Sequence, residues 1–193
     1  MARIAGVKFL GIAPLSYALD GEPVYGDITE IKQFVSFSGT KNFSEMNWYS
    51  NDIVEETFAN VVDIDLEIVV GRLSAELRSQ LMGSEYDQEN GVMVEKSDDA
   101  QQEFALIVVL SQMGTTNGTV NQVYYRVKLT VDGYEAETKT DSITDSTVTI
   151  KGKAIPLSDG RIVASIDSLD EHASEEIINN WTKEVYTGAK AAV

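Results

Sequence analysis

The chain contains no cysteine, which excludes disulfide bonds and thiolate metal sites. It has one histidine, His172, so any metal site would have to be built almost entirely from oxygen ligands. No stretch approaches the ~20 consecutive apolar residues of a membrane span. Lys8 interrupts the N-terminal segment where a signal peptide would need an unbroken apolar core. These absences predict a soluble protein made in a cytoplasm, with no membrane partner.

Basic residues are also scarce, because 15 Lys and Arg stand against 31 Asp and Glu and give a net charge of −16. Tight binding to nucleic acid or to an anionic membrane needs clustered cations, so the composition argues against both. It does not exclude a protein that stays beside DNA without binding it. Hydrophobic residues make up 43% of the 193 residues, which is enough for the core of one domain.

Residues 59–70 form the most informative stretch, because apolar and acidic side chains alternate along it. Ile64, Leu66 and Ile68 occupy even positions, whereas the odd positions include Asp63, Asp65 and Glu67. Alternate side chains of a β-strand point to opposite faces, so the pattern predicts a strand with one apolar and one anionic face. Two interpretations remain open. The sheet covers a core and faces solvent, or it lines a channel that carries DNA without binding it.

Most of the remaining chain also has strand patterns. The apolar run 104–113 and the alternating run 122–132 flank an Asn-Gly turn and predict a hairpin, in which Val123, Tyr125, Val127, Leu129 and Val131 share one face. Further strands are predicted at 28–37, 44–50, 53–58, 134–139, 147–153 and 161–166, with a turn at 39–42. Helices are predicted near 73–82 and 175–186, and each ends at a glycine.

These elements predict a mainly β fold, an antiparallel β-sandwich or barrel with a flanking α-helix, since the strands are joined by short turns rather than by crossover helices. We expect an N-terminal arm over residues 1–15, a single domain over 16–188 and a short C-terminal tail over 189–193. The arm is either an edge strand of its own domain or a strand given to a neighbouring copy. Residues 85–103 carry seven acids and one lysine and are predicted to be a solvated loop.

A search for catalytic chemistry finds little. His172 has no nucleophile motif beside it, and the glycines of residues 6–11 lack the Lys-Ser/Thr pair of a phosphate-binding loop. Asp63 and Asp65 would lie ~7 Å apart on one strand face, but no calcium-binding loop accompanies them. We therefore predict a protein that is not an enzyme and has no catalytic, metal or cofactor site.

Four short segments occur in a characteristic order. They read VKFLGIAPL at 7–15, NWYSNDIVEE at 47–56, LMG at the helix end 81–83 and IKGKAIPLSDGRIVASIDS at 150–168. In this order and spacing, the chain resembles the major tail protein family of long-tailed bacteriophages, in the branch found in phages and prophages of Gram-positive bacteria. The resemblance covers most of the chain, although the 85–103 segment is longer than the family pattern.

The resemblance implies a structural virion protein that stacks as rings, usually hexamers, into the tail tube through which the genome leaves the particle. It implies a β-sandwich whose inner sheet joins a barrel around the lumen. The implied partners are further copies of the chain, the tail tape-measure, terminator and tail-tip proteins, and genomic DNA that passes without tight binding. The implied location is the phage tail, assembled in the bacterial host cytoplasm.

Two surface hypotheses follow from this resemblance. Asp63, Asp65 and Glu67 face the lumen, and the arm and residues 48–56 contact neighbouring subunits or rings. The residues predicted to make these inter-subunit contacts are Val7, Phe9, Leu10, Ile12, Leu15, Trp48, Tyr49, Asn51, Asp52 and Ile53. A chain that lacks residues 2–13 is accordingly expected to fold but not to polymerise.

Two other kinds of protein remain open. A carbohydrate-binding β-sandwich or host-surface adhesion module could stack sugars on Trp48, Tyr49, Tyr124, Tyr125 or Trp181. A tube protein of a secretion system would share the fold of the first interpretation. Hollow rods in electron micrographs would favour a tube, and monodisperse particles with glycan affinity would favour the module.

Overall fold

The computed structural model describes residues 2–50, 53–133 and 147–188, with the side chains of 46–56 outside the description. The fold is mainly β, an antiparallel sheet with two short helices, as the sequence predicts. The strands are β1 (Arg3–Tyr17), β2 (Pro23–Tyr25), β3 (Thr29–Glu30), β4 (Phe34–Ser50), β5 (Ile53–Val70), β6 (Glu85–Asp87), β7 (Val92–Val94), β8 (Glu103–Met113), β9 (Gly118–Val131), β10 (Val148–Ala154) and β11 (Val163–Asp167). The helices are α1 (Ala75–Met82) and α2 (Glu175–Asn180). The predicted strand 134–139 and the tail 189–193 lie outside the described residues.

The main sheet curls on itself into an open barrel. Its strand order is β2-β1-β8-β9-β10-β5-β4, with β3 added to β1 and β11 added to β9. The chain passes from β3 beside β1 directly into β4 at the other end of the sheet, and Ile31 N donates a hydrogen bond to the Leu10 carbonyl oxygen on the way. The apolar faces of both ends therefore contact the same interior core, which includes Leu66, Leu106 and Ile150.

The predicted N-terminal arm is a strand of its own domain, which is one of the two alternatives that the sequence leaves open. Strand β1 pairs antiparallel with β8 from Arg3 to Pro14. Leu10 and Ile12 are buried in the barrel interior, whereas Ala13 and Leu15 are buried on the opposite face. Both faces are covered because β1 lies between two apolar layers. The structure argues against the expectation that a chain without residues 2–13 would still fold, since the deletion removes core residues.

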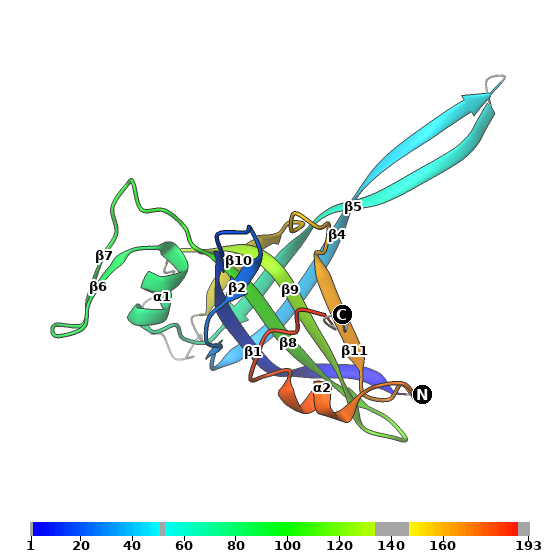
Figure 1. Ribbon diagram of the computed structural model, residues 1–193. Helices are drawn as coiled ribbons and strands as arrows, with labels where there is room; N and C mark the ends of the chain where they lie inside the picture. Colours follow the sequence, from blue (N-terminus) through cyan, green and yellow to red (C-terminus); the bar gives the residue numbers. More distant parts are fainter. Residues whose placement is uncertain (1, 51–52, 134–146, 189–193) are drawn as a thin grey trace, which may run out of the picture.

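A second, smaller core covers the outer face of β1, β8 and β9. It contains Ile107, Val123 and Tyr125 from the sheet, together with Leu157 and Trp181 from the C-terminal third of the chain. Helix α2 lies against this face (Figure 1). The continuous apolar run of β8 follows from this arrangement, because alternate residues fill the two different cores.

The predicted β8–β9 hairpin is present, but its alternation changes phase. Val123 and Tyr125 pack in the outer core, whereas Val127, Leu129 and Val131 pack inside the barrel. A register shift between the pairs Phe104–Val127 and Leu106–Tyr124 inserts one extra residue on β9. Such a bulge reverses the side-chain phase beyond it, so one strand serves both cores. The prediction that all five residues share one face is wrong for this reason.

Strands β4 and β5 form one long hairpin rather than several short strands. They pair from Phe34–Val70 to Ser50–Ile53. The predicted turn at 39–42 is absent, since Gly39, Thr40, Lys41 and Asn42 all pair with β5. The inner half of the hairpin belongs to the barrel, and its outer half extends away from the body (Figure 1).

Helix α1 agrees closely with its prediction. Ser74 caps its N-terminus, and Gly83 ends it at a φ of 72°, where a side chain would also collide with the Ala100 carbonyl oxygen. Leu77 and Leu81 fill one end of the barrel. Part of the acidic segment 85–103 forms the β6–β7 hairpin. Glu95, just after this hairpin, lies 3.6 Å from Arg78 on α1.

Helix α2 is shorter than predicted, because it ends at Asn180 rather than near 186. Trp181 is buried, its indole Nε1 donates a hydrogen bond to the Gln122 carbonyl oxygen at 3.3 Å, and its ring stacks on Tyr186 with centroids 5.4 Å apart. Residues five apart on a continuous helix do not face each other. The helix must therefore stop for Trp181 and Tyr186 to stack over the outer core.

Candidate functional site

The polar face of β5 is the first surface that could carry a function. Ile64, Leu66 and Ile68 are buried in the barrel, so Asp63, Asp65 and Glu67 project from its outer face. This two-faced strand is the one that the sequence predicts. The charge of this face also depends on the adjacent strand β10, because Lys153 lies opposite Asp65 and Lys151 lies opposite Glu67.

Asp63 and Asp65 are held by two shared donors. The Asn42 side-chain amide donates to Asp63 Oδ1 and to Asp65 Oδ2, at 2.7 Å in each case. Lys153 Nζ lies 3.1 Å from an oxygen of each carboxylate. The hydrogen bond from Asn42, followed by that from Lys153, lowers the pKa of both aspartates. Both carboxylates are therefore ionised at neutral pH, and their charge is partly compensated by the lysine.

The same face carries further ion pairs. Lys151 Nζ lies 2.8 Å from Asp132 Oδ2, and Lys128 Nζ lies 3.6 Å from Glu103 Oε1. The acids of β5 form an anionic face on that strand, as the sequence predicts, but lysines of the neighbouring strand lie beside them. Bases of β9 and β10 lie between acids of β8 and β5, so the surface is polar and of mixed charge rather than basic or purely acidic.

The strongest of these pairs joins β8 to β9. Arg126 donates from Nε and Nη2 to the two carboxylate oxygens of Glu103, at 2.8 Å each. The Glu103 side chain is 16% exposed. The hydrogen bond from Arg126 is the main reason that the pKa of Glu103 lies below its ordinary value. This bidentate geometry fixes the bulged part of β9 against β8.

We expect the substitution Glu103→Gln to lower the free energy of unfolding by about 1–2 kcal/mol at pH 7. Since the folded-state pKa is depressed, the contribution is present above the unfolded pKa of ~4.3 and is lost as pH falls through the folded value. Urea denaturation at pH 7 and again near pH 3 measures this difference, with the exposed Glu22→Gln as a control. An equal loss at both pH values would contradict the ionic origin of the effect.

The residues predicted for inter-subunit contacts fall into three groups. Leu10, Ile12 and Leu15 are at most 6% exposed in the subunit itself, so their assignment as contact residues is wrong. Val7 and Phe9 are only partly buried. Trp48, Tyr49 and Ile53 lie on the outer part of the β4–β5 hairpin, where only the backbone is described, and Asn51 and Asp52 lie outside the described residues.

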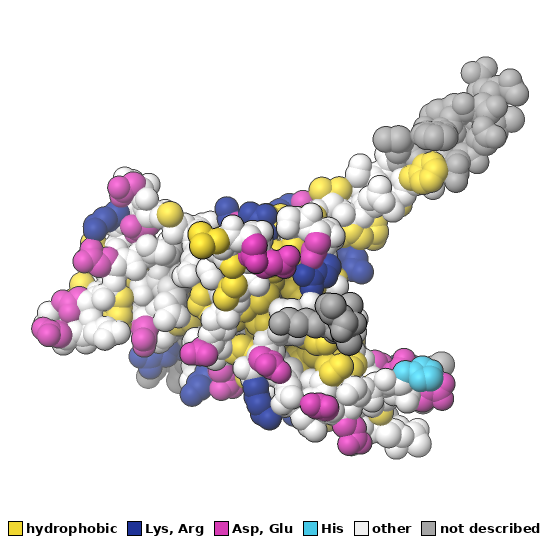
Figure 2. Space-filling view, in the orientation of Figure 1, with side chains coloured by type: hydrophobic (Ala, Val, Ile, Leu, Met, Phe, Trp, Pro, Cys, Tyr) yellow, Lys and Arg dark blue, Asp and Glu magenta, His cyan; other side chains and the backbone are white. Residues whose placement is uncertain are grey.

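The outer part of the hairpin also carries apolar side chains that sequence reasoning did not select. Phe43 is 57% exposed, Phe58 is 41% exposed and Val62 is 47% exposed. Figure 2 shows apolar side chains where this projection leaves the body and again farther along it. The signal available in the sequence was the density of large apolar residues around residues 43–62. A projecting, partly apolar hairpin is typical of a surface that is buried against another molecule.

Three of the aromatic residues considered for sugar binding are buried in the two cores. Tyr124 is 5% exposed, Tyr125 is 2% exposed and Trp181 is 3% exposed. Burial raises the pKa of Tyr124 to about 12, and Arg161 lies over the Tyr125 ring at 5.2 Å. These three rings are consequently enclosed in the cores and present no open face to a ligand.

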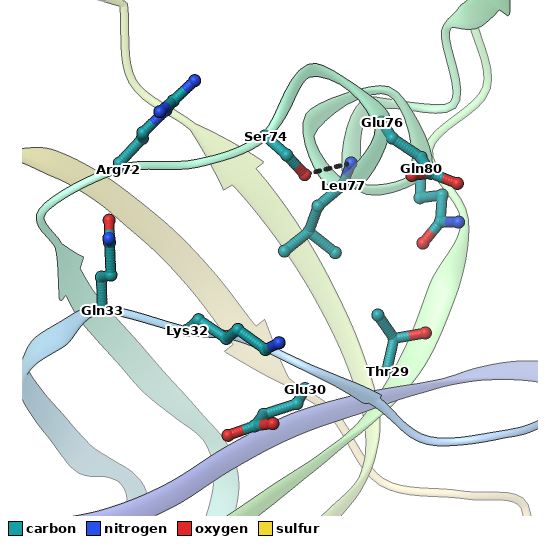
Figure 3. A pocket seen from close by; sticks show the side chains of 9 residues that line it. All are labelled: Thr29, Glu30, Lys32, Gln33, Arg72, Ser74, Glu76, Leu77 and Gln80. Carbon is teal, nitrogen blue, oxygen red and sulfur yellow. Dashed lines mark hydrogen bonds between the residues drawn. The ribbon is translucent and has the colours of Figure 1, made fainter. Parts of the chain in front are cut away.

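A polar cavity of about 440 Å³ lies beside the start of α1 (Figure 3). Two cations, Lys32 and Arg72, and two acids, Glu30 and Glu76, line it. Ser74 accepts a hydrogen bond from Leu77 N at 3.2 Å and so serves as the helix cap. The charges of the lining balance, and this arrangement contains no nucleophile with an adjacent base.

Among the residues that the structure describes, no three His, Asp or Glu side chains gather closely enough to hold a metal ion. His172 is exposed beside Glu171, at 3.5 Å. No helix in the described ranges is both long and apolar enough to cross a membrane.

Comparisons with known proteins give no match, either to the model of any protein family or to any curated protein.

Proposed function

We propose that this protein is a structural subunit that polymerises as stacked rings into the tail tube of a bacteriophage. The observation that carries the proposal is the β4–β5 hairpin, which extends beyond the barrel with exposed Phe43, Phe58 and Val62. A lone subunit gains nothing from exposing such side chains, whereas burial between copies releases water from them. The resemblance to the major tail protein family supports the same assignment.

Unpaired strand edges support self-association as well. Strand β4 pairs only with β5 among the described strands, so one edge of a 17-residue strand is open. Exposed edges of this length favour pairing with another chain. In the proposed tube, such edges join neighbouring subunits around the lumen, and the hexameric ring expected from the family is the starting hypothesis.

The proposal assigns Asp63, Asp65 and Glu67 to the wall of the lumen. Their pairing with Lys151 and Lys153 reduces the local negative charge but leaves no free basic stripe on this face. DNA carries about one negative charge per 1.7 Å. A wall of mixed, mutually paired charges offers few cations to the passing phosphates, which suits a conduit that must release DNA.

The tube would contact tape-measure, terminator and tail-tip proteins, and DNA would pass through it without tight binding. The protein would be assembled in the bacterial host cytoplasm and would function in the virion tail.

Negative-stain electron microscopy of the concentrated, purified protein tests this function. Hollow rods with a regular repeat are the expected result. Monodisperse particles that bind glycans would overturn the proposal in favour of a carbohydrate-binding or adhesion module. A rod would not by itself separate a phage tube from a secretion-system tube, and recovery of the protein from purified phage particles makes that distinction.

Assembly should also be faster at higher salt. Six copies at −16 each bring about 96 negative charges into one ring, and physiological salt screens their repulsion beyond ~8 Å. Light scattering of purified subunits over a salt series measures the rate. Faster assembly at low salt would show that repulsion between subunits is not the barrier.

A further inference from the structure

A groove of about 540 Å³ opens on one side of the barrel, between β4 and the N-terminal half of β1. Among the described strands, no ladder joins β1 to β4, so the groove leads towards the interior core. Ile4 and Val35 line it and are more than half exposed, and Phe37 and Leu110, which also line it, pack against that core. The groove is therefore a largely apolar surface that the described part of its own subunit leaves uncovered.

The lining of the groove carries one charge. Among the described residues, Lys41 is the only charged residue that lines it. The Lys41 side chain is exposed and forms no ion pair within the described ranges. In a chain with a net charge of −16, a groove lined by a cation and by no carboxylate favours an anionic partner that also carries apolar side chains.

The turn between β1 and β2 has the complementary properties, and all of its residues are described. Leu19 in this turn is fully exposed, and Val24 on β2 is 47% exposed. Asp20 and Glu22 are exposed as well, and residues 17–25 contain no lysine or arginine. Neither acid forms an ion pair in the described part of the chain. The turn therefore offers an apolar tip and two negative charges that no cation compensates.

Hydrogen bonds fix the shape of this turn. The Ala18 amide donates to the Glu22 carbonyl oxygen at 3.0 Å, and the Gly21 amide donates to the Ala18 carbonyl oxygen at 2.9 Å. The Glu22 amide donates to Asp20 Oδ1 at 3.2 Å. Gly21 has a φ of 84°, a conformation that favours glycine. Because the turn is already ordered, it loses little conformational entropy when it docks on another surface.

The β6–β7 hairpin is a second exposed segment with apolar and acidic side chains, but it matches the groove less well. Val92 on this hairpin is 50% exposed. Glu85 pairs with Lys96 at 2.8 Å, and Glu95 pairs with Arg78 at 3.6 Å. Since these acids are compensated within the subunit, the β1–β2 turn is the better partner for the cation of the groove.

We infer that the groove of one subunit receives the β1–β2 turn, residues 17–24, of a second copy. The inference rests on the proposed function and adds to it the two surfaces that join successive copies. Val7 in the groove and Tyr17 at the start of the turn are roughly 30 Å apart along β1. The turn therefore does not reach the groove of its own subunit.

The geometry of this contact suits a tube. Turn and groove are different surfaces, so the contact is heterologous and repeats from copy to copy rather than closing as a two-fold dimer. Burial of Leu19 supplies the attraction, and the acids of the turn beside Lys41 select the orientation. The part of β4 beyond Lys41 does not line the groove, so that part of the strand edge stays available to ring neighbours.

Disulfide trapping tests the contact, because the chain has no native cysteine. Two single variants, Leu19→Cys in the turn and Val35→Cys in the groove, are mixed and oxidised under assembly conditions. Both parent side chains are exposed, so neither substitution removes a core residue. A size tag on one variant distinguishes the mixed dimer from the two homodimers. We expect the mixed dimer to form several-fold more than in a matched mixture of Val92→Cys with Val35→Cys, and equal yields would overturn the inference.

A charge swap supplies the second measurement. Lys41→Glu in the Val35→Cys chain should lower the yield of mixed dimer roughly tenfold, and Glu22→Lys in the Leu19→Cys chain should restore it. The control Lys183→Glu changes the net charge equally, away from the groove, and should leave the yield unchanged. A yield that Lys41→Glu does not alter would overturn the charge complementarity on which the docking is argued.

The outcomes separate this inference from the proposed function. Rods in electron micrographs without the mixed dimer would overturn the docking of the turn in the groove and leave the tube function standing. A mixed dimer without rods would support the contact and overturn the tube, and absence of both would overturn both. The expected result is rods together with a mixed dimer that responds to the charge swap.

Discussion

Deletion of residues 2–13 is expected to abolish cooperative folding of the subunit. The deletion removes most of β1, including Leu10 and Ile12, which are 0% and 1% exposed. Burial of two such side chains contributes about 3–6 kcal/mol, against a total stability of about 5–15 kcal/mol for a domain. The deletion also removes the strand that is hydrogen-bonded to one edge of β8, and it opens both cores to water.

Circular dichroism during thermal and urea denaturation measures this effect. Point substitutions within β1 give a matched comparison, because Leu10→Ala should cost about 2–5 kcal/mol, whereas Ile4→Ala, at a side chain that is 60% exposed, should cost less than ~0.5 kcal/mol. A truncated chain with an unchanged cooperative transition would mean that β1 is a dispensable arm after all.

Shortening the β4–β5 hairpin is expected to have the opposite pattern, namely loss of assembly with retention of the fold. Residues 45–59 can be replaced by Asn-Gly, a two-residue turn that joins Ser44 to Asn60, which already pair across the hairpin. The core residues that the structure describes on β4 and β5 lie outside the deleted segment. The free energy of unfolding should therefore change by less than ~1 kcal/mol, while rod formation is lost.

Sedimentation velocity and electron microscopy measure assembly of the shortened chain, and urea denaturation checks its fold. A milder variant, Phe58→Ser, should slow assembly without abolishing it, whereas Val92→Ser on the exposed β7 strand should leave the rate unchanged. Normal rod growth by the shortened chain would contradict the proposed role of the hairpin in assembly.

The elements that the sequence predicted well are those whose signal is local. The alternation of residues 63–68 shows which side chains of β5 face the core, and Gly83 marks the end of α1. The pairing of β8 with β9 also follows from neighbouring segments around a turn. In each case, the residues that determine the structure are close together in the chain, so their pattern can be interpreted without knowledge of the rest.

The features that were missed depend on distant partners. Lys153 forms an ion pair with Asp63 from 90 positions away, and nothing in residues 59–70 indicates it. The sequence of β1 does not show that it is an inner strand, because its partner, β8, lies about a hundred residues later. The phase change in β9 arises from a single inserted residue whose position is fixed by packing against two cores.

The sequence by itself determined the fold class, the two-faced character of β5, the position of α1 and the lack of cysteine and basic clusters, because composition and short periodic patterns are local properties. Only the tertiary structure decided that the acids of β5 lie beside lysines of β10, that β1 is a core strand, and that the β4–β5 hairpin projects beyond the barrel. Those facts depend on the register and order of strands, which are set by packing between residues far apart in the chain.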